Sequence, residues 1–374
     1  MDKKIILFIR VFSRYGGVEN FCYRFYQFLV EKGYEVKVVC GENKTDIKNE
    51  NIIELGLWRP GRFLKTLSYY LKASKFAKNS DNSLNIALTK VNYCHVIRAG
   101  SGSHLDFLIS SLRGYRGYSK LKKIIKRLFS PVNYLTVFIE KKMYRDNPSL
   151  KLVVFQSNMA KKEFLNRYKL TNLNYKIIPN SVNKNIFKLM HDGTNTFYEK
   201  YSLSKDKIYV GFAASNFELK GLIYLIDAIK YLPDNVELLI AGNRNPKKYI
   251  EKAKQLKIED RVHFLGKVEN MNDFYNVLNV FCLPTFYDTC ANVVLESLSV
   301  GTPVITTTNN GAQDFVLDGK NGFLLSVDEL SGAKLADLIV KAIKINKYDV
   351  IRYSKLYTDE EIFNKYLEEI KGLI

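Results

Sequence analysis

Two carboxylates eight residues apart carry the most specific chemistry in this sequence. Asp288 and Glu296 lie in the stretch from Leu283 to Ile305, which has the pattern of a strand end, a loop, a helix beginning near Cys290 and a further strand. At 3.6 residues per turn, the two acids would occupy the entrance and the second turn of that helix and could face one cleft. The spacing alone also fits an amphipathic helix with two solvated acids.

The residues between the acids are suited to an anion. They are small, and their backbone N–H groups would form the helix N-terminus: Thr289, Cys290, Ala291 and Asn292. The first N–H groups of a helix have no partner within it, so they can bind phosphate oxygens. A diphosphate there, with Glu296 on ribose hydroxyls and Asp288 on a sugar, would bind a nucleotide sugar. This is our working hypothesis.

Two further junctions between a strand and a helix could take part. Gly16 and Gly17 follow the apolar run 5–12, and a glycine turn lets an anionic ligand approach the backbone closely, although it also serves simple packing. Lys220 stands between the strand 208–214 and the helix 221–231. A lysine at a helix N-terminus opposes the helix dipole, a cost that a bound diphosphate would reverse, but most single lysines are solvated surface charges.

The elements that must position these residues alternate between strands and helices. Buried apolar runs at 5–12, 34–40, 51–55 and 152–156 are separated by helical stretches, and the rhythm restarts at 208–214, 236–243 and 261–268. This pattern predicts an α/β fold with doubly wound parallel sheets, whose ligands bind beyond the carboxyl ends of the strands. The polar, irregular segment 188–205 is the expected linker between two domains.

Several of these segments resemble the retaining glycosyltransferase family 4. The resemblance rests on D-x7-E with the closing G-T-P-V-I at 301–305, on S-x-x-G-G-V-E at 13–19, on K-G at 220–221 and on I-P-N-S-V at 178–182. It implies the GT-B fold, two Rossmann-like domains facing each other across a cleft. The expected domains are 1–187 for the acceptor, 206–360 for the donor, and a C-terminal helix 361–374 returning to the first domain.

The segment R-A-G-S-G-S-H at 98–104 is similar to one in enzymes of lipopolysaccharide core assembly. The resemblance therefore implies that Arg98, Ser101 and His104 bind the acceptor. A histidine titrates near neutral pH, so His104 could bind the donor sugar or move a proton, but it could equally be structural. Ser101 stands where these enzymes often have Asp, and Asp288 where the family has Glu. Residues 216–219 lack the Arg that usually precedes the lysine.

The function implied is transfer of a hexose, with retention, from a nucleotide diphosphate sugar (UDP-linked) to a lipopolysaccharide-core or other cell-surface glycan acceptor. Donor residues would be Gly16, Gly17, Lys220, Asp288, Glu296 and the N–H groups of 289–292, with Asp288, Lys220 and His104 catalytic. No D-x-D motif occurs at the expected position, so we expect neither a metal nor a cofactor. A nucleotide-sugar epimerase of the same fold and a non-catalytic glycan- or polyanion-binding relative remain alternatives.

The charge is concentrated in one half of the chain. Of the net charge of +19 over 374 residues, residues 1–180 contribute 33 basic against 13 acidic side chains. Such a field attracts nucleic acid, anionic lipid or a phosphorylated acceptor. No nucleic-acid motif is recognised, so we expect no nucleic-acid partner. In the stretch 113–130, Leu121, Ile125 and Phe129 lie on an apolar stripe flanked by lysines, which predicts a helix on an anionic membrane or one packed on its own domain.

The location expected is the cytoplasm, at the inner face of the cell membrane. The N-terminus does not have the pattern of a signal peptide, and no apolar stretch reaches the roughly 18 residues of a spanning helix. The five cysteines are scattered and odd in number, so neither a disulfide framework nor a zinc site is indicated and a reducing compartment fits.

Overall fold

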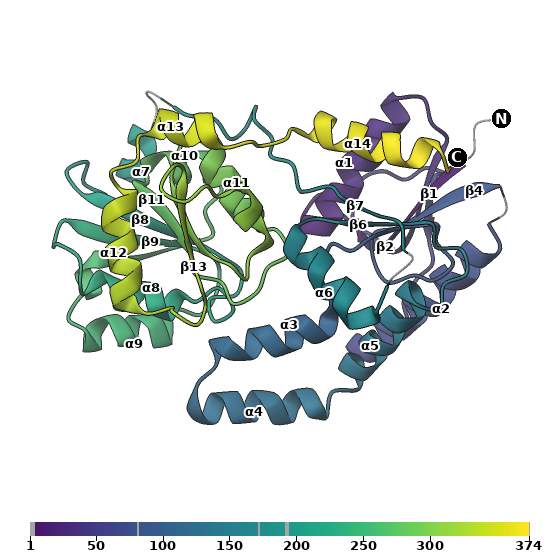
Figure 1. The fold of residues 1–374 in the computed structure, drawn as a ribbon, viewed down its shortest axis with the longest axis horizontal. Helices are drawn as coiled ribbons and strands as arrows, with labels where there is room; N and C mark the ends of the chain where they lie inside the picture. The colour runs from purple at the N-terminus through teal and green to yellow at the C-terminus, as the bar shows by residue number, and fades with distance from the viewer. Residues whose placement is uncertain (1–3, 81, 171–172, 191–193, 374) are drawn as a thin grey trace. The chain divides into compact units, whose positions relative to one another are not determined.

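The structure of the protein is a computed structural model that describes residues 4–80, 82–170, 173–190 and 194–373. The chain divides into two compact units (Figure 1). The first contains the described residues of Met1–Ile109, Gly117–Pro179 and Glu360–Ile374, and the second those of Ser110–Arg116 and Asn180–Asp359. Each unit has its own parallel sheet with helices packed around it.

The sheet of the first unit has the strand order β3-β2-β1-β4-β5-β6-β7, with every pair parallel. Its strands are β1 (Lys4–Phe12), β2 (Val36–Asn43), β3 (Ile52–Glu54), β4 (Ser83–Ala87), β5 (Val96–Arg98), β6 (Leu152–Phe155) and β7 (Tyr175–Ile177). The apolar run of β1 is central and buried from Ile5 to Ile9, because helices cover both faces of a doubly wound sheet.

The helices of the first unit are α1 (Gly17–Glu31), α2 (Gly61–Lys78), α3 (His104–Ser110), α4 (Gly117–Leu128), α5 (Pro131–Tyr144), α6 (Asn158–Tyr168) and the C-terminal α14 (Asp359–Lys371). The expected cap of α6 is present, since the Ser157 hydroxyl accepts from the Ala160 N–H at 3.2 Å. Helix α14 packs on α1, with the Phe363 ring 5.2 Å from that of Phe25.

The sheet of the second unit has the order β10-β9-β8-β11-β12-β13, again all parallel. Its strands are β8 (Ile208–Ala213), β9 (Val236–Ala241), β10 (Val262–Gly266), β11 (Val280–Leu283), β12 (Val304–Thr307) and β13 (Gly322–Leu325). Its helices are α7 (Asn195–Lys200), α8 (Leu222–Ile229), α9 (Lys247–Gln255), α10 (Met271–Val277), α11 (Asn292–Ser299), α12 (Gly332–Ala342) and α13 (Lys347–Tyr353).

The division between the units differs from the expected domain boundary. We placed the end of the first domain at residue 187 and a linker at 188–205, of which residues 191–193 lie outside the described ones. In the structure the second unit begins at Asn180, and residues 195–200 form α7. The physical reason is that Phe197 of α7 is buried in the second core, 6.3 Å from the Phe274 ring.

The strand order brings the predicted loops together within each unit. Because all strands of a sheet are parallel, their carboxyl ends lie at one edge. In the second unit β8, β11 and β12 are neighbours, so the loops that follow them converge at that edge. These are the loops that carry Lys220, Asp288 and Asn310.

Candidate functional site

The loops after β8 and β11 are joined by hydrogen bonds that place Lys220. The Phe286 N–H donates to the Leu219 carbonyl at 2.9 Å, and the Asn216 side chain accepts from the Leu219 N–H at 3.2 Å. Gly221 has a φ of 73°, and a Cβ there would lie 2.2 Å from the Pro284 carbonyl oxygen. Only glycine fits a left-handed position that approaches a neighbouring backbone so closely.

Lys220 and Asp288, assigned separately to the diphosphate and the sugar, form an ion pair with each other. The Lys220 ammonium contacts Asp288 Oδ2 and also donates to the Tyr287 carbonyl at 3.2 Å. The other carboxylate oxygen, Asp288 Oδ1, accepts from the Cys290 N–H at 3.1 Å. The structure therefore brings the two predicted residues together, with the carboxylate as the counter-ion of the lysine.

The N-terminal segment of α11 differs from the expected set of free donors. The Cys290 N–H is occupied by Asp288, and the Ala291 N–H donates to Asn310 Oδ1 at 3.2 Å. Thr289 is also buried together with these two residues. Side chains of the same unit thus accept from the N–H groups of Cys290 and Ala291, and the binding of a diphosphate there stays a prediction.

Asn292, the first residue of α11, is held by its side chain. The side-chain amide of Asn180 donates to Asn292 Oδ1 at 2.7 Å and to the Cys290 carbonyl at 2.9 Å. Asn180 stands directly after the division between the units. The I-P-N-S-V turn, noted in the sequence as a family resemblance, thus supports the loop that carries the predicted donor residues.

Glu296 lies in the second turn of α11, as its spacing predicted. The hydroxyl of Tyr275 on α10 donates to Glu296 Oε2 at 2.8 Å. Burial, followed by the neighbouring charge of Glu296, raises the pKa of Tyr275 well above its usual range, so the hydroxyl stays protonated and donates. Tyr275 was not found by sequence reasoning, because one aromatic residue in a short helix has no distinguishing pattern.

In the first unit, Gly16 and Gly17 form the turn at the start of the 15-residue helix α1. Gly16 has a φ of 103°, in the region that favours glycine, and a Cβ there would lie 2.4 Å from Glu19 Oε2, whereas a Cβ on Gly17 would meet no atom within 4 Å. The turn is therefore open at Gly17, while the Glu19 carboxylate lies against Gly16. The close approach of an anionic group to this turn stays a prediction.

The three predicted acceptor residues do not all lie together. Ser101 and His104 line a cavity of about 680 Å³, whereas Arg98 is 5% exposed and lies with its guanidinium 4.0 Å from the centre of the Phe21 ring. Arg98 is not among the residues that line the cavity. It is buried against Phe21, and its assignment to the acceptor stays a prediction.

The ring of His104 is held in place by Asn133. Its ring Nε2 lies 3.1 Å from Asn133 Oδ1. Since Asn133 Nδ2 donates to the Arg127 carbonyl at 3.1 Å, the amide oxygen must face the ring, which assigns the hydrogen to His104 Nε2. Burial is the largest influence and lowers the pKa of His104, so the imidazole is neutral at pH 7.

A buried carboxylate supports this histidine. Glu140 on α5 is 1% exposed and accepts from the His104 N–H at 3.0 Å, from Lys90 Nζ at 2.5 Å and from the Tyr168 hydroxyl at 2.6 Å. Buried charges occur where they are paired and hydrogen-bonded in this way. Sequence reasoning missed Glu140, whose only local signal is an acid that follows the apolar residues Val137 to Ile139.

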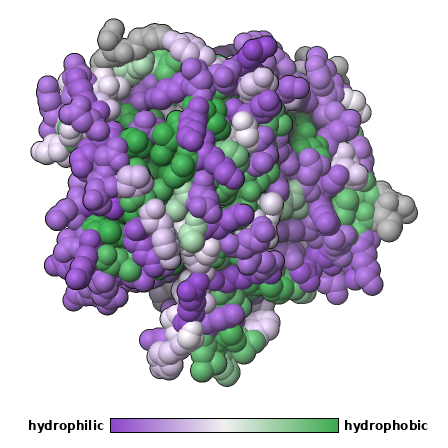
Figure 2. Space-filling model, turned by 60° about the vertical axis from the view of Figure 1, so that its left-hand side comes forward, coloured by the Kyte–Doolittle hydropathy of each residue, from purple (hydrophilic) through white to green (hydrophobic). Residues whose placement is uncertain are grey.

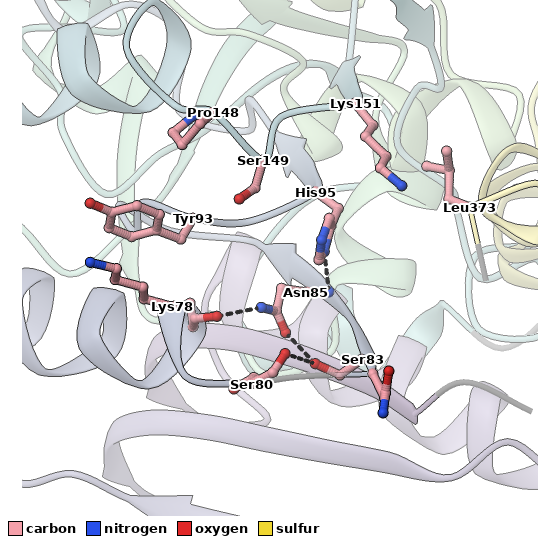
Figure 3. A pocket seen from close by; sticks show the side chains of 12 residues that line it. Lys78, Ser80, Ser83, Asn85, Tyr93, His95, Pro148, Ser149, Lys151 and Leu373 are labelled. Atoms are coloured by element: carbon pink, nitrogen blue, oxygen red, sulfur yellow. Dashed lines mark hydrogen bonds between the residues drawn. The ribbon is translucent and has the colours of Figure 1, made fainter.

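A second, polar pocket of about 500 Å³ lies in the first unit, beside the amino ends of β4, β5 and β6 (Figure 3). This is the edge of the sheet opposite to the carboxyl ends of its strands. Lys78 lies there with its ammonium 5.7 Å from the Tyr93 ring centre, and His95 Nδ1 accepts from the Asn85 N–H at 3.1 Å. Lys151 also lines it. It contains none of the predicted site residues, so its lysines are suitable positions for control variants.

Comparison with known proteins places these features in a family. A model described as "Glycosyltransferase Family 4" matches residues 15–185, and one described as "Glycosyl transferases group 1" matches residues 205–344. The matched parts of the chain are therefore glycosyltransferase domains. The chain is 30% identical over 201 residues to the capsular polysaccharide biosynthesis glycosyltransferase CapM of Staphylococcus aureus, and 21% identical over 228 residues to the lipopolysaccharide glucosyltransferase WaaG of Escherichia coli.

The alignment with CapM covers 52% of this chain and 50% of CapM, and the alignment with WaaG covers 59% of this chain and 60% of WaaG. Solved structures are similar over almost the whole chain. A crystal structure of WaaG superimposes with a TM-score of 0.81 at 16% identity, over 98% of this chain and 100% of that one. A crystal structure of Anabaena HepE in complex with UDP and glucose superimposes with a TM-score of 0.70 at 17% identity, over 99% of this chain and 100% of that one. These likenesses and the two parallel sheets show the GT-B fold.

Neither a metal-ligand cluster nor a membrane-spanning helix occurs among the described residues. No group of three or more His, Cys, Asp or Glu residues is arranged to hold a metal ion within the described part of the chain. Among the helices of the same residues, none is long and apolar enough to cross a bilayer.

Proposed function

We propose that this protein transfers a hexose from a UDP-linked sugar to a lipopolysaccharide-core or other cell-surface glycan, with retention of anomeric configuration and without a metal. The observation that carries the proposal is the ion pair of Lys220 and Asp288 at the carboxyl edge of the second sheet, in a part of the chain that matches a glycosyltransferase model. Glu296, bonded to Tyr275, follows in the second turn of α11. CapM and WaaG, which are named for capsular and lipopolysaccharide synthesis, support the acceptor class.

The chemistry assigned to these residues is charge stabilisation. The bond between the anomeric carbon and the diphosphate oxygen breaks, the diphosphate keeps the electron pair, and the acceptor oxygen bonds to the same carbon while its proton passes to the leaving diphosphate. Lys220 supplies a fixed cation for that leaving group, which is worth most in a site of low dielectric. Glu296 accepts the ribose hydroxyls, and the Tyr275 hydroxyl holds it in place.

The test is a donor panel. UDP-, ADP- and GDP-glucose are incubated with the protein, with and without a lipopolysaccharide core oligosaccharide, and release of the nucleoside diphosphate and the product anomer are measured. We expect release of UDP that depends on the acceptor, and an α-linked product. Conversion of the donor sugar without acceptor would indicate the epimerase alternative. Glycan binding without any turnover would indicate a non-catalytic relative.

We further propose that α4 binds an anionic membrane surface and that the protein works at the inner face of the cell membrane. None of the residues of α4 is buried, and the large apolar side chains Leu121, Leu128 and Phe129 are exposed, Phe129 by 82%. In Figure 2, apolar surface gathers at the lower end of the face shown, at the height of α4 in Figure 1. Exposed lysines flank this stripe, an arrangement typical of interfacial helices.

The structure selects the variants for this test. Lys126 lines the cavity near His104, and Arg127 donates to the Leu108 carbonyl, so neither is changed. Lys120→Glu with Lys122→Glu should release the protein from phosphatidylglycerol vesicles, because each lysine near such a surface contributes about 1 kcal/mol. Phosphatidylcholine vesicles should not bind at all. The control, Lys341→Glu with Lys344→Glu near the end of α12, has the same charge change, and equal loss there would contradict the role of α4.

A further inference from the structure

The cavity beside His104 is built from several elements of the first unit. It lies where the carboxyl ends of β1 and β4 meet the start of α2 and the helices α4 and α5, and its volume of about 680 Å³ admits a saccharide. Its floor is fixed by hydrogen bonds, since the Arg10 N–H donates to Thr89 Oγ1 at 3.0 Å and that hydroxyl donates to Tyr69 Oη at 3.3 Å.

Four cationic side chains line this cavity, and one carboxylate. The carboxylate, Glu140, already pairs with Lys90 at 2.5 Å. Within residues 4–80, 82–170, 173–190 and 194–373, the other three cations, Arg10, Arg62 and Lys126, have no salt-bridge partner. Neutral His104 adds no positive charge. The cavity therefore has an excess of positive charge that its own residues do not balance.

An excess of like charge around one concave space has a physical consequence. The cations repel one another while the cavity holds only water, and low-dielectric walls concentrate their field inside it. A bound oxyanion would relieve this repulsion and satisfy the donors. Arginine presents a planar set of N–H donors that matches phosphate and carboxylate, and two of the three cations are arginines.

The same cavity has apolar walls. Leu88 and Val132 line it together with the Phe107 ring. A free inorganic anion would not use these surfaces, whereas the apolar face of a sugar ring would. We propose that the acceptor is an anionic saccharide, carrying a phosphate or a carboxylate that Arg10 and Arg62 bind within this cavity. The inference rests on the glycosyl transfer proposed above and names the chemical class of its acceptor.

The test uses three simple probes that share one ring: glucose, glucose 6-phosphate and glucuronate. Calorimetry at constant ionic strength should show that the two anions bind at least about tenfold more tightly than glucose, because hydrogen bonds to charged groups are stronger than those between neutral groups. The tighter of the two anions identifies phosphate or carboxylate as the acceptor group. Equal binding of all three probes would overturn the proposal.

Variants separate a specific site from the general positive field. Arg10→Gln with Arg62→Gln should remove the preference for the anions and leave glucose binding unchanged, and both side chains are exposed, so the fold should persist. Lys78→Gln with Lys151→Gln, in the pocket of Figure 3, removes the same charge at the opposite edge of the sheet. Equal loss of anion binding in this control would refute the assignment to the cavity.

UDP binding by the second unit is measured in the same samples. If UDP fails to bind while the anionic probes still bind at Arg10 and Arg62, the proposed transfer is wrong and the anion site stands. If UDP binds and the probes do not discriminate, the transfer stands and the anionic acceptor is wrong. The two failures are therefore distinguishable.

Discussion

The ion pair between Lys220 and Asp288 predicts that a donor diphosphate competes with a carboxylate for its lysine. The decisive perturbation is Asp288→Asn, which removes the negative charge but keeps a side-chain oxygen that can accept from the Cys290 N–H, now bonded at 3.1 Å. The lysine then lacks a competing anion. If Asp288 acts as the counter-ion in the free protein, the variant should bind a nucleoside diphosphate more tightly.

The size of the effect follows from how exposed the pair is. A carboxylate and a phosphate oxygen about 6 Å apart repel by roughly 3 kcal/mol at an effective dielectric constant of about 20, and by less than about 1 kcal/mol in water. The side chains of Lys220 and Asp288 are 14% and 25% exposed, so the pair lies between these limits. We expect a gain of about 1.4 kcal/mol, which is about tenfold in affinity.

Calorimetry with UDP and with UDP-glucose distinguishes the two roles of Asp288. A counter-ion of Lys220 affects both ligands equally, so both should bind about tenfold more tightly to Asp288→Asn. A sugar ligand, as the family resemblance implies, would leave UDP unchanged and weaken UDP-glucose, and that result would refute our reasoning. The control is Glu218→Gln in the loop before Lys220, whose partner is Lys248 at 2.6 Å, and it should change neither affinity.

Five further variants have expected outcomes. Glu296→Ala should abolish calorimetric UDP binding, and Tyr275→Phe should weaken it by only about fivefold, since one neutral hydrogen bond contributes about 1 kcal/mol. Lys220→Ala should lower kcat/KM at least about thirtyfold, and a normal rate would remove it from the site. Glu140→Gln should reduce the free energy of unfolding in urea by about 2 kcal/mol or more, because Lys90 loses its counter-charge. Because burial depresses the pKa of folded His104, the unfolded protein binds a proton there more readily. The free energy of unfolding should therefore decrease as pH falls below about 6.5, and His104→Gln should reduce this pH dependence.

The sequence by itself determined the local elements and most of the fold class. The continuous apolar run of β1 reads as a buried parallel strand, and Ser157 marks the start of α6 because its cap bond spans only three residues. Pro131 begins α5 for a similar local reason, as its missing N–H costs nothing at the first helical position. The strand β4 was not predicted, since its sequence, SLNIA, is short and mixes polar with apolar residues.

Only the tertiary structure decided which charged groups meet. The pairing of Lys220 with Asp288 joins residues 68 positions apart, and Glu140 reaches Lys90 across 50. Such contacts depend on which strands are neighbours, and no local pattern encodes that order. The burial of Arg98 against Phe21 is of the same kind. Capping and hydrophobic periodicity act over a few residues, whereas the electrostatic environment of a side chain is set by loops that converge only when the sheet has formed.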